Sequence, residues 1–191
     1  MIQRLSRGIA FCCLISAVVS ANRAQAAEDY VVDGVHSTVL FRVKHLGTSY
    51  AWGRFNGIAG KVSLSGPSPS VDVQVNADSI DTGNANRDKH LKSPDFFNVK
   101  QFPTIAFKST QVKRISEERY EVEGTLSLHG VNRPIKVMLD HTGSGKNQQG
   151  TAIAGFETTF PIKRSDFGMK FLLEGISDDV HLIVSLECGG K

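Results

Sequence analysis

Cysteine and long hydrophobic runs are both scarce in this sequence. There are three cysteines in 191 residues. The apolar stretch near the amino terminus, Ile9 to Val19, is well short of the roughly 20 residues that a transmembrane helix needs. Cys12 and Cys13 lie inside this stretch, whereas the acylated cysteine of a lipoprotein follows its apolar run. The sequence therefore predicts no stable membrane anchor.

The same stretch has the three-part layout of a secretory signal peptide. Arg4 and Arg7 precede it, and the small-residue segment Ala24-Gln-Ala26 follows it, as is typical of a leader that is cleaved. We predict a signal peptide over residues 1–26, cleavage after Ala26, and a mature domain over residues 27–191 in the periplasm.

An excess of charge of one sign is also missing. Removing Arg4, Arg7 and Arg23 leaves 19 of the 22 basic residues, against 19 acidic residues. A neutral mature chain lacks the positively charged surface that binds nucleic acid and the cluster of basic residues that binds anionic lipid. We therefore expect no nucleic-acid partner.

The mature chain has a single cysteine, Cys188, so it cannot form an internal disulfide. A domain of about 165 residues buries roughly 70% of its unfolded surface and needs no covalent staple. Because Cys188 begins a Cys-Gly-Gly-Lys tail, we expect this end of the chain to fray.

Spacings typical of metal sites and catalytic sites are absent as well. The six histidines form no His-x-His or His-x-x-x-His pair, so we predict no metal site. His36 and Ser37 follow Asp33, which leaves two interpretations open, an oriented nucleophile or a turn whose side chains bond to the backbone. The turn is the better match, and we predict no catalytic residue.

Alternation of apolar and polar residues is the dominant pattern. It recurs from Val39 to Val43, from Val71 to Val75, from Tyr120 to Leu128 and from Val180 to Leu186, with further examples between them. A period of two indicates strands with one dry face. About eight such runs, separated by glycine-rich turns, predict a single-domain all-β antiparallel sheet that closes to hide its edges.

One segment departs from this alternation. Residues 84–98 contain helix-compatible residues that end before Ser93-Pro94, which predicts a short helix from Ala85 to Lys92. The turn after it presents Phe96 and Phe97. Arg87 and Asp88 lie on this helix, and we leave open whether Arg87 pairs with a carboxylate or contacts a ligand headgroup.

Several motifs together resemble the YceI family of bacterial periplasmic proteins. They include Asp33-Gly-Val-His36-Ser37, Arg87-Asp88-Lys-His90-Leu91-Lys-Ser93-Pro-Asp-Phe96-Phe97, Gly124-Thr-Leu126-Ser-Leu128-His-Gly130 and Arg164-Ser-Asp166-Phe167-Gly168. Their order and spacing extend from Tyr30 to Glu187. The largest departure from the pattern is the longer segment from Lys163 to Gly175.

The resemblance implies an eight-stranded antiparallel lipocalin-like barrel with a short helix, whose interior holds a long-chain isoprenoid lipid or isoprenoid quinone. It implies a role in transport, storage or stress-related handling of that ligand, with no cofactor. We expect the ligand to contact Phe41, Val43, His45, Phe55, Ile80, Arg87, His90, Phe96, Phe97, Phe107, Leu126, Phe156 and Phe167.

Other functions stay open at this point. An eight-stranded barrel is wide enough either to fill with side chains or to hold one slender ligand. The alternatives are therefore an enzyme that acts on a lipid-like substrate and a filled barrel that works as a surface adaptor. The sequence also leaves a homodimer open.

Overall fold

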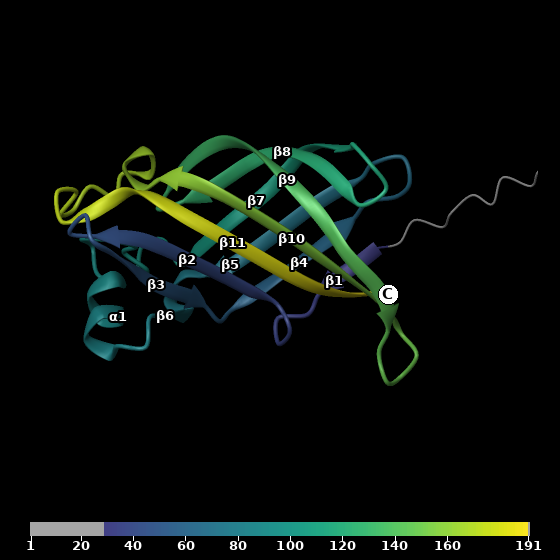
Figure 1. The fold of residues 1–191 in the computed structure, drawn as a ribbon, viewed down its shortest axis with the longest axis horizontal. Helices are drawn as coiled ribbons and strands as arrows, with labels where there is room; N and C mark the ends of the chain where they lie inside the picture. Colours follow the sequence, from purple (N-terminus) through teal and green to yellow (C-terminus); the bar gives the residue numbers. More distant parts are fainter. Residues whose placement is uncertain (1–28, 191) are drawn as a thin grey trace, which may run out of the picture.

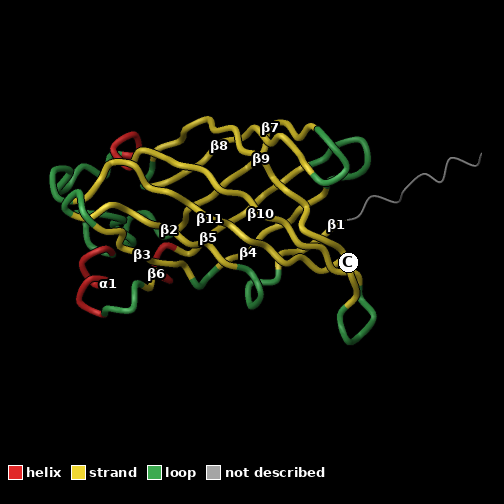
Figure 2. Tube along the Cα trace, viewed as in Figure 1, coloured by secondary structure: helices red, strands yellow, loops and turns green. Residues whose placement is uncertain are grey.

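The computed structural model describes residues 29–190. The predicted leader and its cleavage site lie outside these residues. The described chain is an elongated barrel of strands with one α-helix at the side of one end (Figures 1 and 2). Within this part of the chain, no helix is long and apolar enough to cross a membrane.

The strands and helices follow one another along a single domain. They are β1 (Asp29–Val32), β2 (Thr38–His45), β3 (Ser49–Phe55), β4 (Ile58–Ser63), β5 (Ser70–Asn76), η1 (Ala77–Ser79), β6 (Ile80–Asp81), α1 (Ala85–Leu91), β7 (Thr104–Arg114), β8 (Arg119–Leu128), β9 (Val131–Lys146), β10 (Ala152–Lys163), η2 (Arg164–Phe167) and β11 (Ile176–Gly190).

Eight of these strands form a closed antiparallel ring in the order β1-β4-β5-β7-β8-β9-β10-β11. The ring closes because β1 pairs with β4 on one side and with the end of β11 on the other, where Tyr30 lies opposite Gly190. The predicted eight-stranded antiparallel barrel with a short helix is confirmed.

The other three strands widen the barrel at the opposite end. β2 pairs with the first part of β11, β3 pairs with β2, and β6 pairs with β3. Among the described strands, β6 has no second neighbour, so strand pairing does not close the ring there. The strands therefore form a complete ring at the β1 end, which we call the closed end, and an incomplete ring at the α1 end.

The predicted alternation places the apolar side chains inward. On β2, Val39 and Phe41 are buried, while Arg42 and Lys44 face outward. The ring of Phe41 crosses the backbone of β3 at Gly53, where a Cβ atom would collide with it. A glycine at this position lets an aromatic side chain occupy the barrel wall at close range.

The helix begins and ends where its sequence predicts. Asn84 caps α1, and its side chain accepts a hydrogen bond from Arg87 N at 3.0 Å. Residue Lys92 is the C-cap, so the predicted range differs from the observed one by a single residue. The helix is held at the edge of the barrel by Thr82, which bonds to both Arg87 and Asp88.

The closed end is a conventional hydrophobic core. Val62, Phe156 and Cys188 are almost or fully inaccessible, and the Phe156 ring meets Tyr30 edge-on at 6.2 Å. The expectation that the Cys188 tail frays is wrong, because residues 188–190 belong to β11 and pair with β1. Burial raises the pKa of the Cys188 thiol to about 12.

Candidate functional site: an apolar cavity open at one end

The barrel contains a cavity of about 960 Å³ between the closed-end core and the α1 end. Aliphatic and aromatic side chains of the strands form most of its wall, and α1 and the segment after it complete the wall near the opening. This volume lies at the upper end of the range for small-molecule sites. The structure therefore excludes a barrel filled completely by its own side chains.

The cavity opens at a mouth bordered by α1, the β2–β3 hairpin and the segment 168–175. Solvent-exposed residues of its lining, such as His45, Ser49 and Asn86, lie there. Farther in, the wall is made by residues such as Val73, Val122 and Leu139. The cavity thus has polar and aromatic residues together at its opening and apolar residues at depth.

Most of the residues expected to contact a ligand line this cavity. They come from four strands and from the helical segment, which are far apart in the sequence. The ten that line it are Phe41, Val43, His45, Phe55, Arg87, His90, Phe96, Phe97, Phe107 and Leu126.

Three expected contact residues are not part of the lining. Ile80 is buried on β6 and pairs with Phe55. Phe156 lies beyond the inner end of the cavity, packed against Tyr30. Phe167 belongs to a separate cluster with Leu126 and Leu128. All three are apolar and buried, as lining residues are, but they pack within hydrophobic clusters and do not reach the cavity.

Arg87 and Asp88 of α1 both bond to Thr82, which precedes the helix. Arg87 donates to Thr82 Oγ1 and to the Thr82 carbonyl, each at 2.7 Å. Asp88 accepts from the Thr82 hydroxyl at 2.6 Å and from its N–H at 2.9 Å. Neither a pairing of Arg87 with a carboxylate nor a free headgroup contact describes this arrangement. Arg87 instead docks the helix while lining the mouth.

His90 belongs to an aromatic cluster at the mouth. Its Nε2 atom lies 2.8 Å from Asp95 Oδ2. Its ring meets Phe96 and Phe171 edge-on, at centroid distances of 5.1 and 5.5 Å. This cluster joins the helical segment to segment 168–175 across the opening.

Arg164 is a lining residue that the sequence analysis did not single out. Its side chain is only 4% exposed, and its guanidinium donates to the carbonyls of Met169, Phe171, Ile176 and Ser177 at 2.8–3.0 Å. Burial lowers the pKa of this guanidinium, and Asp178 opposes the shift. Arg164 thereby fixes segment 168–175 beside the mouth.

Thr158 is a buried polar residue in the strand part of the cavity wall. Its side chain is buried on β10, and its hydroxyl has no hydrogen-bond partner among residues 29–190. A buried hydroxyl without a partner costs about 1–3 kcal/mol.

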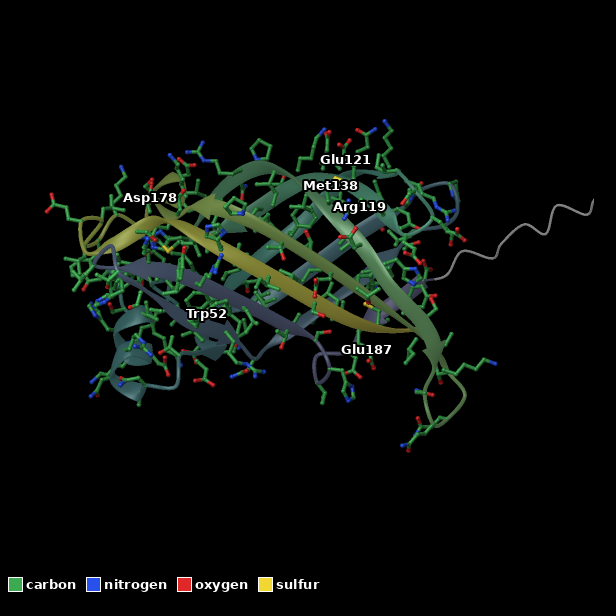
Figure 3. All side chains as sticks on the ribbon, viewed as in Figure 1. Trp52, Arg119, Glu121, Met138, Asp178 and Glu187 are labelled. Atoms are coloured by element: carbon green, nitrogen blue, oxygen red, sulfur yellow. The ribbon has the colours of Figure 1, made fainter. Side chains whose placement is uncertain are left out.

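The polar group of the β1–β2 turn lies far from the mouth. His36 Nδ1 is 2.9 Å from Asp33 Oδ2 and 3.7 Å from Glu187 Oε1, and Glu187 lies away from α1 (Figure 3). The Ser37 hydroxyl bonds to the backbone of Glu187 on β11, and Val35 N donates to Asp33 Oδ1 at 2.8 Å, as in a turn whose side chain bonds to the backbone. Asp33, His36 and Glu187 could supply three metal-ligand atoms within 4.8 Å of one another, a grouping that local spacing does not reveal.

Fold and cavity together define a lipocalin-like barrel of the kind that encloses a slender apolar ligand. The chain belongs to the YceI-like domain family, whose family model matches residues 30–188. This confirms the resemblance found in the sequence.

Relatives match most of the chain. A UPF0312 protein of Pseudomonas aeruginosa is 40% identical over 96% of this chain and 97% of its own. A UPF0312 protein of Yersinia enterocolitica is 42% identical over 88% of this chain and 89% of its own.

Solved structures share the fold. The Campylobacter jejuni YceI protein has a TM-score of 0.69 at 31% identity and covers 78% of this chain and 90% of its own. A domain of Saccharophagus degradans, described as polyisoprenoid binding, has a TM-score of 0.68 at 18% identity and covers 85% of this chain and 98% of its own.

Proposed function

We propose that this protein holds one long-chain isoprenoid lipid or isoprenoid quinone in the barrel. The observation that carries the proposal is the 960 Å³ cavity, which is apolar at depth, closed at one end and open at the other. Such a shape suits a ligand with a long hydrocarbon tail and a small polar head.

The energetics favour a tail over a polar ligand. Burying each methylene contributes on the order of 0.8 kcal/mol, so a chain of several isoprene units needs no charged anchor at depth. The polar head belongs at the mouth, near Arg87 and His90. The polyisoprenoid-binding description of the Saccharophagus domain supports this choice of ligand class.

Binding accounts for the site better than catalysis. Acid–base or nucleophilic chemistry needs two or more titratable groups that converge on one point. Around this cavity, Arg87, His90 and Arg164 each bond to separate neighbours, and the other titratable lining residues, His45 and Tyr50, are exposed at the mouth. The proposal therefore assigns no cofactor, metal or catalytic residue to the barrel.

The cellular role follows from the predicted leader. With residues 1–26 removed on export, the barrel is a periplasmic protein that carries or stores its ligand in normal growth or under envelope stress. Neither nucleic acid nor a permanent membrane anchor is part of this role.

The decisive test is organic extraction of the natively purified protein followed by mass spectrometry. We expect about one long-chain isoprenoid per barrel, because one slender cavity takes a single chain. Delipidated protein is then titrated with a quinone and, separately, with a polyprenyl phosphate. Absence of lipid from the extract together with no saturable uptake of either ligand would refute the proposal.

Two variants of β11 separate cavity binding from binding elsewhere. Val184 lines the cavity, and Val184→Trp fills it without adding charge. Its neighbour Ile183 has the opposite parity and is outside the lining, so Ile183→Trp is the matched control. We expect Val184→Trp to lower isoprenoid occupancy at least tenfold, the equivalent of about 1.4 kcal/mol, and Ile183→Trp to leave it unchanged.

A further inference from the structure

Exposed apolar side chains gather at the mouth of the barrel. Ten large hydrophobic residues are exposed in the part of the chain that the structure describes, and six of them lie on two segments beside the opening. We call these six the rim patch: Leu46, Tyr50, Trp52, Phe171, Leu172 and Leu173. Contiguous apolar surface of this kind marks an interaction site.

The two segments form one surface. Leu46 N donates to the carbonyl of Gly175 at 2.8 Å, and Lys44 N donates to Ser177 Oγ at 2.9 Å. The β2–β3 hairpin and segment 168–175 therefore lie side by side at the α1 end of the barrel (Figure 1). Trp52 continues the patch along the same half of the barrel (Figure 3).

The backbone holds two of these leucines outward under strain. Leu46 has φ 49° and Leu172 has φ 51°, a left-handed conformation that costs a non-glycine residue roughly 1–2 kcal/mol. Leu46 is a central residue of the β2–β3 hairpin turn, which Thr48 N closes on the His45 carbonyl, and hairpin turns commonly use positive φ at this place. The turn thus holds Leu46 outward, and the side chains of Leu46 and Leu172 are 64% and 54% exposed.

The support beneath the patch is rigid. Arg164 bonds to the carbonyls of Met169 and Phe171, and the Phe171 ring packs on Phe96 at 5.4 Å. These contacts therefore hold the exposed leucines of segment 168–175 in a fixed position.

Cations outnumber acidic residues on the two segments of the rim patch, because segment 168–175 has Lys170 and Glu174 and the other segment is basic. Residues 42–52 contain Arg42 and Lys44 and no acidic residue. The Arg42 guanidinium lies 4.4 Å from the ring centre of Tyr50 and 5.5 Å from that of Trp52. Tyrosine, tryptophan and a nearby cation suit the headgroup level of a bilayer, where apolar and polar surroundings meet.

We propose that the rim patch docks the mouth of the barrel onto a lipid bilayer. The leucines and Phe171 enter the boundary between headgroups and acyl chains, while Arg42 and Lys44 face lipid phosphates. This inference rests on the proposed function for its purpose: a long tail that crossed water would lose about 0.8 kcal/mol for every exposed methylene. Docking lets the tail pass directly between bilayer and cavity.

The test is flotation of the chain from Ala27 onward, which contains the whole barrel, with vesicles of equal parts phosphatidylethanolamine and phosphatidylglycerol. We compare it with the double variant Leu46→Glu/Leu172→Glu. Ile115→Glu is the matched control, because Ile115 is 48% exposed at the β7–β8 turn, at the closed end. We expect the double variant to bind vesicles on the order of 100-fold more weakly and the control to bind as the parent does.

A second double variant separates docking from folding. Leu46→Gly/Leu172→Gly relieves the left-handed strain, so its thermal stability should rise while its vesicle binding falls. Equal flotation of both double variants and the parent would overturn the docking proposal. So would a dimer in sedimentation velocity that the glutamate variant dissolves, together with no vesicle binding by the parent, because the patch would then join two copies.

Lipid extraction keeps this test distinct from that of the proposed function. The rim leucines lie outside the cavity lining, so both double variants should still take up isoprenoid supplied in detergent solution, without a bilayer. Loaded variants that bind vesicles normally refute docking alone. An empty parent whose vesicle binding depends on the rim patch refutes the isoprenoid proposal and leaves docking standing.

Discussion

Cys188 lies near the end of the chain in a Cys-Gly-Gly-Lys sequence, yet the structure buries its side chain. It lies on β11 between Val32 of β1 and Ala154 of β10, wholly buried. Cys188→Ser places a hydroxyl in this apolar site, and we expect the free energy of unfolding to fall by about 1–3 kcal/mol. Denaturant titration measures this, with Cys188→Ala as the control that shortens the side chain without adding a polar group.

The thiol itself supplies an independent measurement. With its pKa raised to about 12 by burial, the native protein should not react with a thiol reagent at neutral pH, and reaction should begin only on unfolding. Rapid labelling of the folded protein would show that the β1–β11 seam opens.

His36 gives the stability a small pH dependence. Its hydrogen bond to Asp33, together with the charges of Asp33 and Glu187, raises the pKa of His36 above 6.5 and lowers that of Asp33. The histidine's contribution is therefore complete below pH 6.5 and is lost as the pH rises through the raised value. Melting temperatures of the parent and His36→Gln should differ more at about pH 6 than at about pH 8. A constant difference would contradict the ion pair.

Single residues were predictable where local pattern decides their position. Alternation alone placed Phe41, Phe107 and Leu126 on the inner face. It could not place Arg164, because the carbonyls that receive its hydrogen bonds lie up to 13 residues farther along the chain. The burial of Cys188 likewise depends on β1, at the other end of the domain.

At the scale of elements, Thr82 provides the hydrogen bonds that hold Arg87 and Asp88 of α1 to the barrel. Thr82→Val removes the hydroxyl that donates to Asp88 and accepts from Arg87. We expect faster hydrogen exchange over residues 85–91 and a several-fold faster release of ligand, since about 1–3 kcal/mol of docking energy is lost. Thr110→Val is the control, because its hydroxyl makes one exposed contact of 3.3 Å. Equal exchange in both variants would mean that aromatic packing alone holds the helix.

Elements could be predicted from the sequence when they were long or clearly punctuated. Asn84 and Pro94 delimit α1, and β8 and β11 alternate over many residues. The short strands β1, β3, β4 and β6 contain too few alternating positions to be separated from loops. The rim patch is visible in the sequence as Phe171-Leu172-Leu173, an apolar run without alternation. A strand with one inward face would alternate.

At the scale of the whole molecule, the predicted export signal has a geometric consequence. β1 begins at Asp29 and is built into the closed end, so a retained leader would hold that end, and not the mouth, at a membrane. We expect amino-terminal sequencing of periplasmic protein to begin at Ala27. Full-length chain in the membrane pellet would contradict both the cleavage and the proposed orientation.

The closed end is packed by Tyr30, Val62 and Phe156. The cavity therefore has one opening, at the mouth. A departing ligand and its replacement must use the same opening, and the occupant has to leave first. Exchange should therefore be first order: its rate is set by departure alone and stays constant however much competing ligand is added. The rate at which this barrel delivers its ligand therefore depends on the residence time of the bound molecule and not on the concentration of the molecule that replaces it.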